Sequence, residues 1–120
     1  MYHRVLVIGR VAREAQTLNP TQIRFELAST TGGDEKHQDI WFTVFADGKL
    51  ATAYRNLRKG QRLLIEGVLV ADESGHPSVR TNREGKPFAR FEIRAVAISA
   101  MGTASSYGPF PDAEAEQFEQ

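Results

Sequence analysis

Cysteine is absent from the 120-residue chain, and so are long hydrophobic runs. Without cysteine there can be no disulfide, thiolate metal site or cysteine nucleophile, which agrees with a reducing compartment. The N-terminal apolar run, VLVIG, is too short for a signal-peptide core or a membrane span. A chain of this length is most simply one domain with one core. We therefore expect a soluble, cytoplasmic protein without a membrane segment.

A net charge is also lacking, because 15 Lys and Arg residues balance 15 Asp and Glu residues. Residues 103–120 hold four acids and no Lys or Arg, whereas residues 1–102 hold 15 basic and 11 acidic residues. A mildly basic body with an acidic appendage suggests a protein that binds a polyanion. Because the last part has few apolar residues, we expect a domain over 1–102 and a flexible, disordered acidic tail over 103–120.

Residue patterns for catalysis are missing too. The three histidines, His3, His37 and His76, do not have the spacing of metal ligands. The Gly-Lys-Leu at 48–50 lacks the upstream glycine and the Ser or Thr of a nucleotide-binding P-loop. The carboxylates show no paired arrangement for general acid and base catalysis. We therefore predict that the protein is not an enzyme and carries no metal and no cofactor.

What the chain does contain is a succession of β patterns. Apolar residues alternate with polar ones, or cluster between turn signals, in five segments. These segments are residues 2–11, 23–30, 39–47, 61–72 and 88–101. The first has an expected bend near Gly9. In the second, alternation predicts three side chains inward, Ile23, Phe25 and Leu27, and three outward, Arg24, Glu26 and Ala28. In the last, it predicts one face with Phe91, Ile93 and Ala95 and another with Arg90, Glu92 and Arg94. A polar loop at 32–39 makes a hairpin of the second and third segments, and the loop at 73–87 has an expected short strand pairing around 78–81.

One helical pattern interrupts the strands. After Gly48, apolar residues recur with the spacing of one helix face: Leu50, Ala53, Tyr54 and Leu57. The cations Arg58 and Lys59 follow, and Gly60 is the expected stop. The predicted helix therefore continues through residues 58–59. Five short antiparallel strands with one short helix between the third and the fourth match the all-β, five-stranded Greek-key barrel of the OB-fold.

The third strand has two unlike faces, because side chains alternate along a strand. One face is wholly apolar: Ile40, Phe42, Val44 and Ala46. The other mixes two rings with a hydroxyl and a carboxylate: Trp41, Thr43, Phe45 and Asp47. A buried unpaired carboxylate is costly, so we expect this second face to be half open to solvent. The alternative is that Trp41 and Phe45 pack beneath a loop or against another subunit.

Five pieces of the sequence, taken in order, resemble bacterial single-stranded DNA-binding proteins. They are MYHRVLVIGRVAREAQ, FELAS, WFTVFADGKLA, LRKGQRLLIEGVL and REGKPFARFEI. The resemblance, which spans residues 1–101, implies an OB-fold that binds single-stranded DNA without sequence preference in DNA replication, recombination or repair. It also implies a homo-oligomer, a tetramer or a dimer, associated with the nucleoid.

The resemblance further implies which residues contact DNA. Trp41 falls where the family keeps a stacking tryptophan, and Thr43 and Phe45 share its face. Four cations match basic positions of the family and are candidates for phosphate contacts: Arg4, Lys49, Arg58 and Lys59. The loop before the last strand adds three more candidates: Arg80, Arg83 and Phe88. An arginine there can stack on a base as well as pair with a phosphate.

The chain departs from the family pattern in ways that weaken DNA binding. Asp47 stands where the third strand usually carries a second stacking aromatic, and its carboxylate repels phosphate. The loop after Ala28 and the loop at 73–87 lack the tryptophans that are common there. Each stacking ring contributes about 1–3 kcal/mol, so we expect weaker binding, a shorter footprint and a specialised paralogue.

The acidic tail suggests a second role. Members of the family often end in acidic residues and a terminal phenylalanine motif that docks on replication and repair proteins. Acids and a ring persist here: Asp112, Glu114, Glu116 and Phe118. Two polar residues follow the phenylalanine, which departs from the family ending. We expect contacts with replication and repair proteins, and the alternative is a solubilising terminus.

Two other functions fit the same fold. Asp47 favours an OB-fold protein-interaction subunit of a primosome-like or recombination complex, with weak nucleic-acid binding. An RNA-binding OB domain is the third interpretation, because stacking does not inspect the sugar. Trp41 and Phe45 favour the binding of single-stranded DNA.

Overall fold

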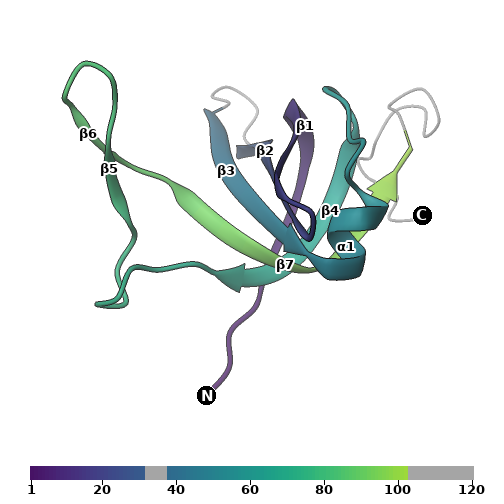
Figure 1. Ribbon diagram of the computed structural model, residues 1–120, viewed down its shortest axis with the longest axis horizontal. Helices are drawn as coiled ribbons and strands as arrows, with labels where there is room; N and C mark the ends of the chain where they lie inside the picture. Colours follow the sequence, from purple (N-terminus) through teal and green to yellow (C-terminus); the bar gives the residue numbers. More distant parts are fainter. Residues whose placement is uncertain (32–37, 103–120) are drawn as a thin grey trace.

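The computed structural model describes residues 1–31 and 38–102 (Figure 1). In these residues the chain forms seven strands and one helix. They are β1 (Val5–Asn19), β2 (Gln22–Thr31), β3 (Gln38–Asp47), α1 (Gly48–Ala53), β4 (Arg62–Leu69), β5 (Val79–Thr81), β6 (Pro87–Ala89) and β7 (Phe91–Met101). The expected tail at 103–120 lies outside the described residues, as does most of the polar loop before β3.

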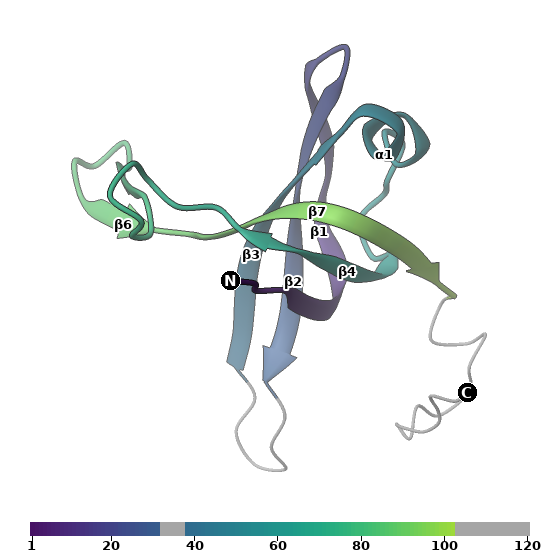
Figure 2. The same cartoon turned by 90° about the horizontal axis from the view of Figure 1, so that it is seen from below.

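Five of the strands close a barrel in the order β1, β2, β3, β7, β4. β5 and β6 form a separate hairpin, which projects from the barrel on the side away from α1 (Figures 1 and 2). The predicted five-stranded OB-fold barrel is confirmed, with its short helix between the third and fourth strands along the chain.

The expectation that all barrel strands pair antiparallel is wrong for one pair. β3 and β7 run parallel, with Phe42 opposite Phe91 and Phe45 opposite Arg94. The other neighbours in the barrel are antiparallel. A closed ring of five strands cannot alternate in direction all the way round, so one pair has to be parallel. This pair places the last strand directly beside β3.

β1 is longer than the strand expected over 2–11, because it pairs with two neighbours in turn. Residues 5–10 pair with β4, and residues 10–19 pair with β2. A Cβ atom at Gly9 would lie 2.5 Å from the carbonyl oxygen of Ala28, so only glycine lets β1 approach β2 this closely. Register shifts begin beyond Val11 and let the strand curve around the barrel.

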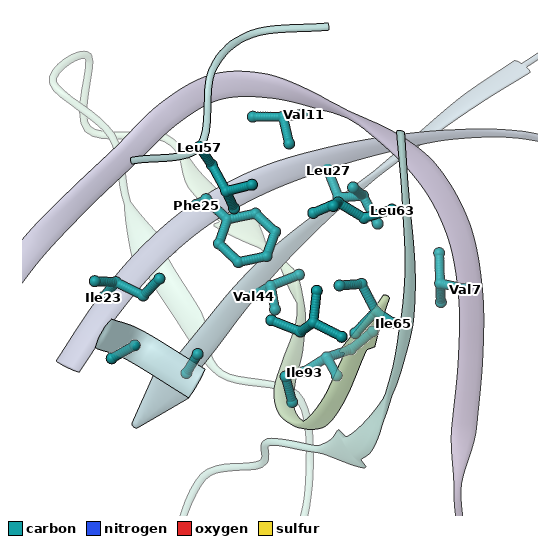
Figure 3. Close-up of a cluster of buried hydrophobic side chains, with 14 residues drawn as sticks. Val7, Val11, Ile23, Phe25, Leu27, Val44, Leu57, Leu63, Ile65 and Ile93 are labelled. Carbon is teal, nitrogen blue, oxygen red and sulfur yellow. The ribbon is translucent and has the colours of Figure 1, made fainter. Parts of the chain in front are cut away.

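Alternating side chains of the barrel strands fill the interior (Figure 3). The largest fully buried residues are Ile23, Phe25, Leu27, Leu63, Ile65, Ile93, Val11 and Val44. The inward positions predicted for Ile23, Phe25 and Leu27 of β2 are therefore confirmed, although Ala28, expected to point outward, is buried as well. On the predicted common face of β7, Ile93 and Ala95 are buried, whereas Phe91 is exposed. Each such side chain contributes about 1.5–3 kcal/mol through the apolar surface that it removes from water.

The helix is shorter than predicted. α1 ends at Ala53, so the prediction that it continues through residues 58–59 to a glycine stop is wrong. Tyr54 donates a hydrogen bond from its hydroxyl to the carbonyl of Ile98 at 2.9 Å, and Leu57 packs in the core. Because the chain turns to bury these two side chains, it leaves the helical path early. No helix in the described part of the chain is long and apolar enough to cross a membrane.

The segment expected as one strand over 88–101 is divided in two. Its first residues belong to β6, in which Phe88 lies opposite Arg80 of β5, and β7 begins at Phe91. The strand pairing predicted around 78–81 is confirmed by this hairpin.

Candidate nucleic-acid interface

Trp41 lies on the outer face of β3 with 53% of its surface exposed. Its register partner on β2 is Ala28, whose small side chain cannot cover the ring. An exposed indole on a strand offers a flat π surface on which a base can stack. The predicted open face is therefore confirmed at Trp41.

Phe45 shares this outer face and is half-buried between two arginines. Arg24 of β2 lies opposite Phe45 on one side, and Arg94 of β7 lies opposite it on the other. Neither arginine is among the site residues predicted from the sequence. Alternation already placed their side chains outward, but only the parallel pairing of β7 with β3 shows that they flank this ring.

Thr43 lies between the two rings and is closed to a ligand. Only 3% of its surface is exposed, and its register partners are Glu26 on β2 and Glu92 on β7. The predicted contact of Thr43 with DNA therefore does not fit the structure, because a buried hydroxyl between two carboxylates cannot reach a nucleic acid. Glu92 is also 3% exposed, and its carboxylate accepts a hydrogen bond from the Arg80 guanidinium at 3.0 Å.

The β5–β6 hairpin holds three of the predicted residues. Arg80 ties the hairpin to β7 through Glu92, and 48% of the Arg80 side chain remains exposed. Phe88 lies opposite Arg80, and the guanidinium of Arg90 lies 5.3 Å from the centre of the Phe88 ring. Arg83 occupies the exposed turn between β5 and β6. Arg80 and Phe88 thus join the β3 side of the molecule, whereas Arg83 stays at the tip of the hairpin.

Three other predicted cations lie apart from the hairpin. Lys49 belongs to α1, and Arg58 and Lys59 follow it in the connection to β4. α1 and the hairpin lie on opposite sides of the barrel (Figure 2). The structure therefore divides the predicted basic residues into two groups.

Arg13 of β1 connects the two groups. It lines one surface hollow with Lys59, and it lines another, of about 100 Å³, with Arg24 and Arg90. Glu26 also borders this second hollow, so its charge is mixed. Arg13 and Arg90 are not among the predicted site residues, because the bulges of β1 and the end of the hairpin decide where they lie.

Arg4 is engaged by residues of its own chain. Its Nε atom donates to the hydroxyl of Tyr2 at 2.9 Å and lies 3.9 Å from the carboxylate of Glu66 on β4. The structure therefore places Arg4 with β1 and β4 rather than with the β3 face.

Asp47 ends β3 on the same face as the two rings. Its Oδ1 atom accepts a hydrogen bond from the side-chain amide of Gln22 at 3.0 Å, and it makes no cap bond to α1. The exposed carboxylate thus keeps a negative charge at one end of the face.

The tail candidates Asp112, Glu114, Glu116 and Phe118 lie outside the described residues, as does His37. Within residues 1–31 and 38–102, no three His, Asp or Glu side chains gather closely enough to hold a metal ion.

No protein-family model and no curated protein matches the chain, but solved structures do. A small single-stranded DNA-binding protein from Streptomyces coelicolor is 25% identical, with a TM-score of 0.55, over 82% of this chain and 93% of that chain. The mitochondrial single-stranded DNA-binding protein of S. cerevisiae is 14% identical, with a TM-score of 0.58, over 86% of this chain and 98% of that chain. A Plasmodium falciparum SSB in complex with single-stranded DNA is 21% identical, with a TM-score of 0.60, over 85% of this chain and 96% of that chain.

These likenesses cover most of each chain, so they concern the whole barrel rather than one motif. In fold, the chain belongs with the single-stranded DNA-binding proteins, as the resemblance of its sequence predicts.

Proposed function

We propose that the protein binds single-stranded DNA without sequence preference. The observation that carries this proposal is the exposed ring of Trp41 on the outer face of an OB-fold barrel, beside half-buried Phe45 and its arginines. The similar structures are named as single-stranded DNA-binding proteins, and one is a complex with single-stranded DNA. A binding role of this kind needs no catalytic step, metal or cofactor.

Stacking and phosphate contacts act together in the proposed interface. Every base has a π face, so Trp41 and Phe45 can hold bases of any identity, at about 1–3 kcal/mol per stacked base. Arg24 and Arg94 flank Phe45 and can pair with the phosphates next to a stacked nucleotide. Phe88 on the hairpin supplies a third ring.

The proposed binding is weak for a protein of this fold. Asp47 and Glu26 place negative charge on the face that holds the rings, and like charges repel phosphate. Each stacked base contributes on the order of 1–3 kcal/mol, so a chain with only two or three rings gains less from stacking than one with the full set of the family pattern. These features support a short footprint and a specialised paralogue rather than the main protein that coats replicating DNA.

Self-association is a second part of the proposal. Large apolar side chains are exposed on the outer faces of β1 and β7: Leu6 at 67%, Ile8 at 45% and Val96 at 45%. An exposed apolar patch commonly marks a protein interface. We propose that copies of the chain associate through this patch as a tetramer or a dimer. Equal masses of the wild type and of a Leu6→Glu variant in sedimentation would rule this patch out.

The cellular role proposed for this activity is DNA replication, recombination or repair in the cytoplasm, at the nucleoid. Single strands are exposed in each of these processes. The tail is proposed to dock on replication and repair proteins, through the acids and the ring named above: Asp112, Glu114, Glu116 and Phe118.

A protein-interaction subunit is the second candidate function. Carboxylates cross the face of β3 at Glu26, Glu92 and Asp47, and this charge suits a basic protein better than a phosphate chain. The neutralisation of Glu92 by Arg80 and the exposed ring of Trp41 favour DNA instead.

The test uses Trp41 as its own reporter, because it is the only tryptophan of the chain. The full chain is titrated with oligo-dT at two salt concentrations while its fluorescence is recorded. We expect strong quenching of the fluorescence, and the midpoint of the titration should move to a higher oligo-dT concentration when salt is raised. Unchanged emission from folded protein would reject stacking on Trp41 and favour the protein-interaction function. Equal or tighter binding of oligo-rU would indicate RNA as a ligand.

A further inference from the structure

A hollow of about 280 Å³ lies next to the Trp41 position on the outside of the barrel. Its lining residues come from three strands: Ile8, Gly9, Arg10, Ala28, Thr30 and Arg62. Two of the six are arginines, and neither belongs to the basic residues that the sequence analysis selected. The hollow is therefore a basic surface outside the residues proposed for the interface.

The strand register aligns this hollow with the stacking ring. Arg62 of β4 lies opposite Arg10 of β1, Arg10 lies opposite Ala28 of β2, and Ala28 lies opposite Trp41 of β3. The four residues form one row across four neighbouring strands. Because neighbouring strands are about 4.8 Å apart, the backbone at Arg10 lies about 10 Å from the backbone at Trp41, two strands away. Ala28 is small and only 1% exposed, so it forms the floor of the row beneath its larger neighbours.

The side chain of Arg10 reaches back along this row towards β3. Its Nη2 atom lies 3.4 Å from Oδ2 of Asp39, which is on the same face of β3 as Trp41 and two residues before it. Thr30 donates a hydrogen bond to the other oxygen of Asp39 at 2.8 Å. The guanidinium of Arg10 is thereby held over β2, beside the base-stacking position.

Arg10 keeps donors for a further ligand. A guanidinium has five N–H groups, and 51% of the Arg10 side chain is exposed despite its contact with Asp39. Arg62 lies opposite Arg10 on β4 and lines the same hollow, so it adds a second positive charge there. A phosphate suits such a site because arginine binds it through paired hydrogen bonds.

We infer that Arg10 and Arg62 form a phosphate-binding site next to Trp41, along which a bound single strand leaves the stacking ring and crosses β2 and β1 over Ala28. The inference rests on the proposed function and extends it around the barrel. It also gives a role to Asp39, which orients Arg10 and competes with the phosphate for it.

The test compares the salt dependence of oligo-dT binding in the full-length wild type and in Arg10→Ala, Arg62→Ala and the double variant. Each lost phosphate contact should reduce the slope of log K against log salt by about 0.7, the value for single strands. We expect the double variant to bind several-fold more weakly at low salt. Arg10→Lys should keep most of the slope. Lys86→Ala on the hairpin removes one exposed charge outside this row and should leave the slope unchanged.

A second variant tests the site in the opposite direction. Asp39→Asn keeps an acceptor for Thr30 but removes the charge that holds Arg10, so oligo-dT should bind more tightly and with a steeper slope. If Arg10→Ala, Arg62→Ala and Asp39→Asn leave affinity and slope unchanged while oligo-dT still quenches Trp41, the inference is overturned and the proposed function stands. If the wild type neither binds oligo-dT nor shows quenching, both are overturned.

Discussion

Trp41 and Phe45 lie on the same face of β3 in different surroundings. Trp41 is 53% exposed beside Ala28, whereas Phe45 is half-buried between Arg24 and Arg94. Trp41→Ala should therefore weaken oligo-dT binding by about 1–3 kcal/mol, because one stacking surface is lost. The change in thermal stability should be small, since little of the ring is buried in the core. Calorimetric titration and a thermal melt of the same samples measure the two effects.

Leu69→Ala is the matched control for this substitution. Leu69 is also 53% exposed, but it lies at the end of β4. Its truncation should leave oligo-dT binding unchanged. Equal affinities of Trp41→Ala and the wild type would show that the ring has no part in binding.

Asp47 provides a test of charge at a single residue. Asp47→Asn removes the carboxylate while the side chain can still accept the hydrogen bond from Gln22. Because one repelling charge is lost from the face of the rings, oligo-dT should bind several-fold more tightly at low salt, and the gain should shrink as salt rises. Fluorescence titration at several salt concentrations measures this. A gain that does not depend on salt would contradict the electrostatic explanation.

At the scale of elements, one ion pair anchors the β5–β6 hairpin to the barrel. Glu92 is 3% exposed, whereas 48% of the Arg80 side chain is exposed, so the two partners are not equivalent. Arg80→Ala would leave a buried carboxylate without its cation and should destabilise the fold by about 1–3 kcal/mol. Glu92→Gln would leave a cation that water can solvate, and it should cost less. Urea unfolding of both variants checks this order.

The double variant Arg80→Ala, Glu92→Gln separates charge from packing. It lacks the buried carboxylate, so it should recover most of the stability that Arg80→Ala loses. If the double variant is as unstable as Arg80→Ala alone, the loss comes from the Arg80 side chain itself rather than from the unpaired charge.

The loop after β4 carries a pH-dependent turn. Asp72 Oδ1 accepts hydrogen bonds from the hydroxyl and the amide of Ser74 and from the amide of His76, and these bonds, that of the Ser74 hydroxyl most of all, lower the pKa of Asp72 from its ordinary value of 3.8. Because the pKa of Asp72 is lower in the folded chain than in the unfolded chain, the ionised carboxylate stabilises the turn fully at a pH above the unfolded pKa. This stabilisation is lost as the pH falls through the folded pKa. NMR shifts of the two amides should therefore change together below about pH 4. Asp72→Asn should abolish this titration.

At the scale of the whole molecule, the charge of the chain is distributed unevenly. Residues 103–120 hold four acids and no Lys or Arg, next to a body with 15 basic and 11 acidic residues. An acidic tail competes with phosphate for basic surfaces, so removal of residues 103–120 should raise oligo-dT affinity at low salt and raise it less at high salt. Parallel titrations of the full and shortened chains measure this. Equal affinities at low salt would exclude such competition.

Much of the fold could be predicted, because the relevant signals are local. The alternation in β2 predicted which side chains enter the core, and the change of period after Gly48 predicted one helix at the correct place. The end of the helix could not be predicted. Leu57 fits the face of a continued helix, but the barrel supplies a better position for it, and no local pattern contains that information.

The candidate site could be predicted only in part, because some of its features are local to one strand and others depend on neighbouring strands. Trp41 could be found from strand alternation and from resemblance, since both depend on the strand itself. The burial of Thr43 between two carboxylates, and the flanking of Phe45 by Arg24 and Arg94, depend on which strands are neighbours and in what register.

Residues close together in the chain establish the β patterns, the two faces of β3, the place of the helix and the uneven charge. The parallel pairing of β7 with β3, the burial of Glu92 beneath a hairpin arginine, and the row that joins Arg62 and Arg10 to Trp41 depend instead on contacts between distant segments. These contacts arise when the barrel closes. When five strands form a ring, register across the strands, rather than distance along the chain, sets which side chains meet.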